Sequence, residues 1–417
     1  MNYSHKRYFI ILMCSTLAGL GAIVALNFFT DPFGVYWGFT HGRVISSRAG
    51  IGSRVSIAER LRQDTYDTLL VGTSRVANGL NAQSPELAGR RVLNVGMPGA
   101  NFNEIPPIFD YATQQPSVKE VILCVDFFQF SGREKSCDNF NTSLFNPELS
   151  ALEYHAEKLL SARSCKDSIG IIKRALRNKP QHIVERNQYG EMVKTGIEAI
   201  DAPVVSPSKR RLAFENTLKW YLTTPHLFGK YQYNPESYTL FLKILQLARQ
   251  RNIKLHIVIS PVHAMHLESI HKSGLWDTYE GWKQDLVQAI HEEAKSANKT
   301  EFPLWDFTSY CPYTTEAVDE ADDRQQEYWF GESSHYKTKL GDKILNRILH
   351  GKAAEYPLFG KIINLENLYA HLANLRIDRQ QWCMTQPIQA AWVARLAEEA
   401  GKVPVVMHAS QKEIQRR

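Results

Sequence analysis

No cysteine pattern of a metal site or redox centre occurs in these 417 residues. The six cysteines include no Cys-x-x-Cys pair and no metal-ligand spacing, which argues against zinc. Clustered carboxylates for a divalent cation and a Gly-rich phosphate loop after a strand are also missing. We therefore expect no metal and no cofactor. Disulfide pairing, for instance between Cys137 and Cys165, stays open because spacing alone cannot establish it.

Positively and negatively charged residues are nearly balanced in this chain. The 49 Lys and Arg against 43 Asp and Glu leave a net charge of +6. A nucleic-acid-binding protein ordinarily concentrates more basic charge in a recognisable module, and we find none, so we expect no nucleic-acid partner. The 44% hydrophobic and 22% charged residues are near the globular average. The chain is therefore long and apolar enough for a substantial core.

One long apolar run is present, from Tyr8 to Phe29, and it contains no charge. As a helix it spans roughly 33 Å at ~1.5 Å per residue, enough for a bilayer core of ~30 Å. Lys6 and Arg7 precede it, and Asp31 is the first charge after it. The positive-inside rule then keeps the N-terminus in the cytoplasm and sends the rest across. We expect a single-pass protein of the inner (cytoplasmic) membrane, with its C-terminal domain in the periplasm or outside the cell.

Two alternatives to this anchor stay open. A cleaved signal peptide would be cut after Ala25, but the apolar run continues through Phe28 and Phe29 without a clean small-x-small site. A buried core helix would also be apolar, but the terminal position and the absence of charge argue against it. The uncleaved anchor is the interpretation that we favour.

The rest of the chain divides by composition and pattern. We expect a cytoplasmic stub and anchor at 1–30, a membrane-proximal linker at 31–66, an α/β domain at 67–350 and a helical tail at 351–417. Between about 130 and 235 the strand pattern lapses, so we expect a largely helical insertion there. It carries a basic run that is either a solvated helix face or a surface for anionic lipid or polymer. The run consists of Lys166, Lys173, Arg174, Arg177 and Lys179.

Short apolar runs alternate with helical patterns through the expected α/β domain. The predicted strands are 68–72, 91–95, 121–125, 255–259 and 303–307. The predicted helices lie near 102–115, 238–251, 278–297 and 338–349. Continuously apolar strands that alternate with helices are typical of a mostly parallel sheet covered on both faces, a three-layer α/β/α sandwich. Such sheets bind ligands at the carboxyl ends of their strands.

Two motifs carry side chains of catalytic type to that edge. The stretch LLVGTSRV runs a buried strand into Ser74, and GESSH places Glu332 three residues before His335, just ahead of the last predicted helix. A serine nucleophile needs a base to take its proton and a carboxylate to orient that base. We expect Ser74 to be the nucleophile, His335 the base and then the acid, and Glu332 the carboxylate that orients His335.

The order and spacing of these motifs resemble the SGNH (GDSL-type) hydrolase superfamily, whose fold is a flavodoxin-like α/β/α sandwich. Its members carry the nucleophile after the first strand and an aspartate-x-x-histidine pair near the C-terminal end. GTS stands in the place of the family's Gly-Asp-Ser, and ESSH in that of its final block; the resemblance covers roughly 67–350. NVGMPGAN looks like the second block, which implies an oxyanion donor at Gly96, with Gly99 as second choice and Asn101 as a further binding candidate.

The sequence departs from the family pattern at three points. Thr73 replaces the usual aspartate before the nucleophile, and Glu332 replaces the aspartate beside histidine. The third block, which supplies an asparagine donor, has no clear match. Its place after the third strand is taken by VDFFQF, where Asp126 or Gln129 would contribute to the site. Arg75, beside the nucleophile, would bind an anionic group or form a structural salt bridge.

A histidine follows the fourth predicted strand. SPVHA places His263 at the same sheet edge as Ser74, and His266 is a weaker candidate of the same kind. His263 would contact substrate or assist proton transfer. A polar loop histidine with no catalytic part is the alternative.

The resemblance is nearest to a membrane-anchored branch of bacterial envelopes, whose proteins work beside membrane-bound O-acyltransferases in polysaccharide O-acetylation or teichoic-acid D-alanylation. It implies an acyl-ester hydrolase (esterase) or O-acyltransferase acting on a cell-surface polysaccharide or other envelope polymer. A membrane-bound O-acyltransferase is the implied partner. The alternative is a non-catalytic scaffold that binds such a polymer or partner. A nuclease or phosphatase ranks last, because its metal-binding carboxylates are missing.

Overall fold

The structure, a computed structural model, forms two compact units, each treated by itself below. It describes residues 3–37, 53–133, 136–177, 184–186, 192–194, 207–318, 328–351 and 355–401. Unit 1 consists of 1–65, 137–188 and 192–195, and unit 2 of 66–136, 189–191 and 196–417. The helices at 151–177, which belong to the predicted insertion, pack against the N-terminal helix within unit 1.

Unit 2 is built on a six-stranded sheet in the order β2-β1-β3-β6-β7-β8. Its strands are β1 (Thr68–Gly72), β2 (Val92–Gly96), β3 (Glu120–Val125), β6 (Lys254–Ile259), β7 (Leu304–Asp306) and β8 (Lys361–Ile362). All pairings are parallel except that of β7 with β8. The predicted, mostly parallel sheet is confirmed, and every predicted strand overlaps an observed one. The short antiparallel edge strand β8 was not predicted.

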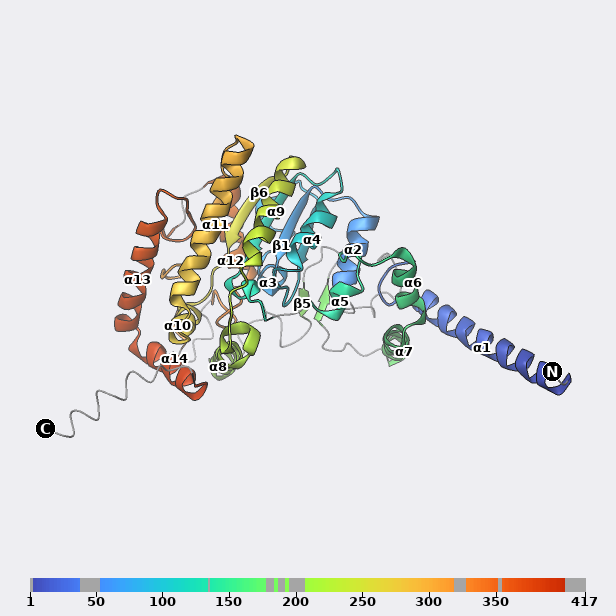
Figure 1. The fold of residues 1–417 in the computed structure, drawn as a ribbon. Coiled ribbons are helices and arrows are strands. Elements are labelled where there is room, and N and C mark those ends of the chain that lie inside the picture. The colour runs from blue at the N-terminus through green and yellow to red at the C-terminus, as the bar shows by residue number, and fades with distance from the viewer. Residues whose placement is uncertain are drawn as a thin grey trace. The chain divides into compact units, whose positions relative to one another are not determined.

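Helices cover the sheet on both faces, which explains why its strands are continuously apolar. The helices α4 (Ile105–Thr113), α9 (Glu236–Gln250) and α11 (Trp276–Ala297) lie side by side, and Figure 1 shows α9 and α11 in front of β1 and β6. On the other face lie α3 (Ser74–Gly79) and α12 (Thr338–His350). Leu70 of β1, Val76 of α3 and Ile344 of α12 share one fully buried core there. The predicted α/β fold with a sheet flanked by helices is confirmed.

Further helices of unit 2 come from the predicted insertion and tail, except α10, which follows β6. They are α8 (Pro207–Thr223), the short turn η4 (Pro225–Gly229), α10 (Ala264–Lys272), α13 (Leu368–Thr385) and α14 (Pro387–Glu399). Buried carboxylates on three elements hold α13: Glu280 pairs with Arg376, Glu268 with Arg379 and Asp306 with His371. Trp382 and Trp392 are buried in the same core as α12. The described part of the tail is therefore an integral layer of unit 2.

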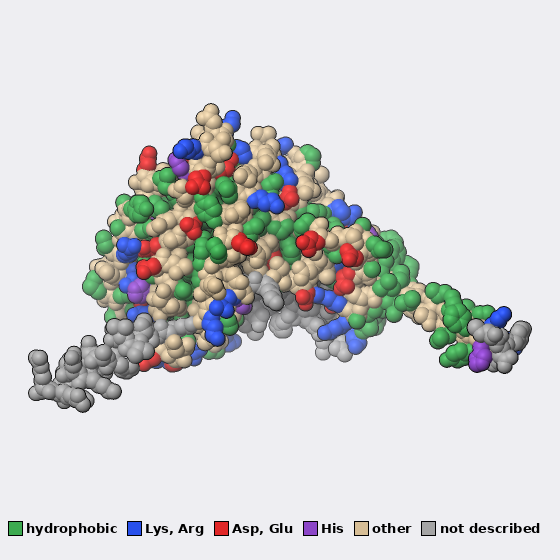
Figure 2. Space-filling view, in the orientation of Figure 1, with side chains coloured by type: hydrophobic (Ala, Val, Ile, Leu, Met, Phe, Trp, Pro, Cys, Tyr) green, Lys and Arg blue, Asp and Glu red, His purple; other side chains and the backbone are tan. Residues whose placement is uncertain are grey.

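Unit 1 contains the long N-terminal helix. Its elements are α1 (Tyr3–Thr30), α2 (Ser53–Gln63), α5 (Asp138–Asn141), α6 (Ala151–Leu160), α7 (Ala162–Arg177) and an antiparallel hairpin of β4 (Val184–Arg186) and β5 (Met192–Lys194). Among the described residues, α1 alone is long and apolar enough to cross a membrane, with a mean hydropathy of 2.4. Figure 2 shows hydrophobic side chains along it. This confirms an N-terminal apolar helix, consistent with a signal anchor or a signal sequence.

Two glycines bring α3 and α12 into backbone contact. A Cβ atom added to Gly341 would lie 1.8 Å from the carbonyl oxygen of Gly79. One added to Gly79 would lie 2.3 Å from the ring of Tyr336. Because Ser74 begins α3 and His335 shortly precedes α12, this crossing joins the two segments that carry the expected nucleophile and base.

We predict that Gly341→Ala lowers the free energy of unfolding of the protein by about 1–3 kcal/mol, because a methyl group has no room against backbone. Gly281→Ala, in the middle of α11, is the matched control, since nothing lies within 4 Å of its added Cβ. It should raise the stability by about 0.5–1 kcal/mol through helix propensity. Denaturant unfolding of both variants measures the difference. Equal changes in the free energy of unfolding of the two variants would mean that α3 and α12 can accept the added methyl group without an energetic penalty.

Candidate functional site

The candidate site lies at the point in the sheet where the order of successive strands changes direction. From β1 the chain crosses to β2 on one side and returns to β3 on the other. In doubly wound sheets of this order, ligands bind at the carboxyl ends of the strands beside that switch point. Ser74 lies two residues beyond the end of β1, and Asp126 directly follows β3. The fold thus presents both residues at the edge where a ligand is expected.

Ser74, His335 and Glu332 form a continuous hydrogen-bonded series. The Oγ atom of Ser74 lies 2.8 Å from Nε2 of His335. The other ring nitrogen, Nδ1, hydrogen-bonds Oε1 of Glu332. With its proton on Nδ1 and directed at the carboxylate, the neutral ring leaves Nε2 to accept the hydroxyl proton of Ser74. The structure therefore brings the three predicted catalytic residues together.

The longer side chain of Glu332 reaches His335 because the loop wraps around its carboxylate. The backbone N–H groups of Ser334 and His335 each donate to it, at 2.8 Å. Thr217 of α8 also acts to lower the pKa of this carboxylate. Burial acts to raise the pKa of Glu332, but the charge and hydrogen bond of His335 and the Ser334 N–H outweigh it, so the pKa lies below its ordinary value. The carboxylate is therefore held ionised beside the ring.

Thr73 begins the short helix that carries Ser74. It is the N-cap residue of α3, and its Oγ1 accepts the backbone N–H of Arg75 at 3.2 Å. The same hydroxyl donates to Oδ2 of Asp126 at 2.6 Å. A threonine caps a helix almost as well as an aspartate. Thr73 therefore connects the first turn of α3 to the carboxylate that follows β3.

Arg75 ties the end of β3 to the loop that carries the triad histidine. Its guanidinium pairs with Oδ1 of Asp126 at 2.7 Å, and both side chains are buried. Its Nε donates to the carbonyl oxygen of Ser334 at 3.1 Å and its Nη2 to the Ser334 hydroxyl at 3.1 Å. Tyr221 of α8 contacts that hydroxyl at 3.0 Å. Of the two roles considered for Arg75, the structure shows the structural salt bridge.

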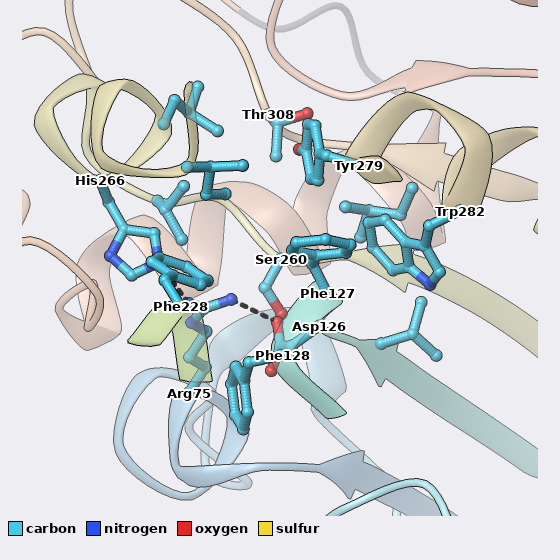
Figure 3. A pocket seen from close by; sticks show the side chains of 15 residues that line it. Arg75, Asp126, Phe127, Phe128, Phe228, Ser260, His266, Tyr279, Trp282 and Thr308 are labelled. Carbon is cyan, nitrogen blue, oxygen red and sulfur yellow. Dashed lines mark hydrogen bonds and ion pairs between the residues drawn. The ribbon is translucent and has the colours of Figure 1, made fainter. Parts of the chain in front are cut away.

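Beside Arg75 lies a small cavity with aromatic walls (Figure 3). Arg75 and Asp126 border it at one end, and His266 contacts Nη2 of Arg75 at 3.3 Å. The aromatic side chains are Phe127, Phe128, Phe228, Tyr279 and Trp282. At about 20 Å³ the cavity has room for water but not for an acyl chain. A substrate would approach Ser74 from outside this cavity.

The NVGMPGAN segment uses most of its polar groups for structure. The N–H of Gly96 donates to Oδ1 of Asn94 at 2.9 Å, and a Cβ at Gly96 would lie 2.3 Å from the backbone nitrogen of Ala77. Asn101 accepts two backbone N–H groups just before α4. Gly99 is exposed and has a φ of +63°, which favours glycine. The N–H of Gly96, our first choice as oxyanion donor, is thus already engaged.

The backbone N–H of Ser74 remains as a donor beside the nucleophile. Thr73 accepts the N–H groups of the three residues after Ser74, through its hydroxyl and its carbonyl oxygen. Within the part of the chain that the structure describes, the N–H of Ser74 itself has no protein acceptor. The first N–H groups of a helix lack intrahelical partners and favour negative charge. An oxyanion formed at Ser74 would meet this donor.

His263 lies outside the triad. It is fully buried as the N-cap of α10, where Nδ1 accepts the N–H of Met265 at 3.2 Å and Nε2 contacts the carbonyl oxygen of Glu316 at 2.8 Å. Burial lowers its pKa to about 3, although the contact with Glu316 acts to raise it. Both ring nitrogens are engaged, so the structure gives His263 a capping role.

Several residues of the site had not been assigned a role from the sequence. Ser334 lies inside the ESSH motif, yet no pattern distinguishes it from Ser333. Tyr221 and Thr217 come from α8, in the predicted insertion, where the sequence offered no catalytic signal. His266 was noted only as a weak candidate, and it contacts Arg75 rather than the triad. Their contacts join segments that are far apart in the chain, so no local motif could reveal them.

No protein-family model and no curated protein matches this chain. Among the residues that the structure describes, no group of three or more His, Cys, Asp or Glu side chains is arranged to hold a metal ion. The described cysteines are all free, Cys137 and Cys165 included. The class that fold and site define is an α/β protein with a mostly parallel six-stranded sheet and a Ser-His-Glu series at its switch point.

We predict that Arg75→Met destabilises the protein by about 3–5 kcal/mol, because the Asp126 carboxylate stays buried without its partner. Adding Asp126→Asn to Arg75→Met should recover part of that loss. The double variant should therefore lose less stability than the two single variants lose together. Denaturant unfolding of the cycle measures the coupling. The exposed pair Arg395–Glu399 is the control, where Arg395→Met should cost less than about 1 kcal/mol. Additive effects at positions 75 and 126 would rule out the buried ion pair.

We also predict a pH dependence from Glu332. Its pKa in the folded protein is lowered, so its carboxylate stabilises the fold fully above the ordinary value near 4.5 and loses this effect as the pH falls through the folded value. The stability difference between the wild type and Glu332→Gln should therefore be largest at neutral pH and shrink below about pH 4.5. Thermal unfolding across pH measures it, with the exposed Glu366→Gln as control. A difference that is constant with pH would contradict the ionised pair.

Proposed function

We propose that this chain is an SGNH-like serine acyl-ester hydrolase or O-acyltransferase that acts on a cell-surface polysaccharide or other envelope polymer. The observation that carries the proposal is the 2.8 Å contact between the Ser74 hydroxyl and Nε2 of His335, whose Nδ1 faces Glu332. A hydroxyl, an imidazole and a carboxylate in this order form the constellation of acyl transfer by serine. Their place at the switch point of a parallel sheet adds support.

The geometry gives each residue one step. The Ser74 oxygen attacks the acyl carbon while its proton passes to Nε2 of His335, and the Glu332 carboxylate stabilises the imidazolium. The N–H of Ser74 donates to the oxyanion of the tetrahedral intermediate. As that intermediate collapses, His335 returns the proton to the leaving alcohol, and an ester on Ser74 remains.

The second half-reaction distinguishes a hydrolase from a transferase. His335 takes a proton from the incoming hydroxyl, which attacks the ester; as the tetrahedral intermediate collapses, His335 passes that proton to the departing Ser74 oxygen. If water attacks, the product is a free acid; if a polymer hydroxyl attacks, the acyl group is transferred. The apolar helix α1 supports an envelope location, where such polymers and a membrane-bound O-acyltransferase partner would lie.

A non-catalytic scaffold is the second candidate, and one observation favours it. The N–H of Gly96 is bound to Asn94, and no asparagine from a third block faces Ser74 among the described residues. The site then offers the oxyanion one backbone donor, and losing a single donor ordinarily costs an enzyme of this type on the order of 10²–10³ in rate. A fold of this kind would still bind a polymer or a partner without turnover.

We predict that the full chain in detergent hydrolyses an activated acetyl ester, and that Ser74→Ala and His335→Ala lower kcat by on the order of 10⁴ or more. Glu332→Gln should cost less, since it removes only the orientation and charge of the ring. Ser296→Ala, on the exposed face of α11, should keep the wild-type rate.

A fluorophosphonate probe gives an independent readout, since it should label Ser74 in the wild type and not in His335→Ala. Equal hydrolysis by the wild type and Ser74→Ala, together with no covalent adduct on Ser74, would favour the scaffold instead. Adding a polysaccharide oligomer as acceptor separates the two enzymatic forms. Acylated oligomer identifies a transferase, and free acetate alone identifies a hydrolase.

A further inference from the structure

The last turns of α1 are part of the folded body of unit 1. Asn27 is fully buried; its Nδ2 donates to the carbonyl oxygen of Leu159 at 2.8 Å, and its Oδ1 accepts from the Ser168 hydroxyl at 2.7 Å. Thr30 donates to the oxygen of Ser168 at 2.7 Å. The end of α6 and the first half of α7 therefore lie against the end of the apolar helix. A bilayer that surrounds α1 would also meet α7.

Helix α7 has three distinct faces. Its first face holds Ser164, Ser168 and Ile171, which are buried. Its second face is apolar and exposed, with Ile169, Ile172 and Leu176 at spacings of three and four residues and exposed fractions of 44, 38 and 80%. Its third face carries the exposed Lys166 and Lys173, which lie about two turns apart along one edge of the apolar stripe. An exposed apolar stripe edged by lysines is typical of helices that lie in a membrane interface.

A groove runs between α1 and α7, with a volume of about 750 Å³. Ile23 of α1, Leu160 of α6 and Ile169 of α7 give it an apolar floor. Lys166 and Lys173 also line it. Apolar walls with two ammonium groups match an acyl chain that ends in a phosphate.

Aromatic residues mark the level of the interface at the same end of α1. The Asp31 carboxylate accepts the N–H groups of Tyr36 and Trp37, which turns the chain back towards the helix. Trp37, 51% exposed, donates its ring N–H to the carbonyl oxygen of Phe28 at 2.7 Å. Its ring lies 5.2 Å from that of Phe28. Trp and Tyr gather where a membrane meets water, so this turn and α7 lie at the depth of the lipid headgroups.

We propose that α7 lies in the membrane interface and binds anionic phospholipid. Ile169, Ile172 and Leu176 lie among acyl chains, and one chain occupies the groove. Lys166 and Lys173 extend from that apolar surface to the phosphates. This selects the lipid-binding interpretation of the basic run over the solvated one. It concerns unit 1 alone and does not depend on the proposed chemistry at Ser74.

The first test places the photoreactive residue p-benzoylphenylalanine at position 176 of the full chain, in vesicles of equal parts phosphatidylcholine and phosphatidylglycerol. Irradiation should attach lipid to the peptide that contains position 176. The control is the same residue at position 163, because Arg163 is exposed on α7 but hydrogen-bonds Asn139 of α5 and lies off the apolar stripe. Lipid adducts at 176 that do not exceed those at 163 would overturn the proposal.

The second test measures the charge preference. Native mass spectrometry of the full chain released from the same bilayer should find phosphatidylglycerol retained over phosphatidylcholine. Lys166→Gln with Lys173→Gln should reduce this preference by about fivefold for each lysine. Lys295→Gln with Lys299→Gln removes the same charge from the exposed end of α11, away from any apolar groove, and should leave the preference unchanged. An equal loss in both double variants, or no loss in either, would refute the lysine–phosphate contact.

Discussion

The carbonyl oxygen of Gly79 faces Gly341 where α3 crosses α12, and the separation of Ser74 from His335 follows from that contact. The two side chains are separated by 261 positions in the sequence. Ser74 is the first residue of α3, and His335 lies three residues before α12. A backbone-to-backbone crossing in a fully buried core therefore restrains the hydroxyl and the imidazole more tightly than surface loops would. The hydrogen bonds of the triad form within that frame.

Two charge systems meet at the ESSH loop, the first partly exposed and the second buried. In one, the Glu332 carboxylate is enclosed by its own loop and faces the ring of His335. In the other, Arg75 and Asp126 neutralise each other and reach the loop through Ser334. The second system touches no reacting atom in our proposal, so Arg75 is a positioning residue. The charged side chains of both systems are stabilised because each has an oppositely charged or hydrogen-bonding partner.

The α/β unit and the membrane-proximal unit have separate physical tasks. Unit 2 supplies a rigid sheet edge with polar side chains at the switch point. Unit 1 packs α6 and α7 on the end of an apolar helix and presents an apolar, lysine-edged face beside it. In our proposal, unit 1 holds the chain to a membrane through α1, which spans the bilayer, and α7, which lies at its surface. A chain that modifies a polymer beside the membrane would be held near its substrate by both.

Local sequence patterns predict the five parallel strands of the sheet, the helices α4, α9, α11 and α12, the apolar helix α1 and the order of the Ser74 and His335 motifs. Those features rest on local periodicity and on the rule that parallel strands end at one edge, both of which can be read without coordinates. Only the tertiary structure decided that Gly96 pairs with Asn94, that Arg75 pairs with Asp126 and that His263 caps a helix. It also shows that α6 and α7 pack against α1 and that α13 packs on buried carboxylates. Each of these depends on which distant group lies within hydrogen-bond or packing distance. No spacing along the chain encodes that, because a polar side chain pairs with whatever group the fold brings beside it.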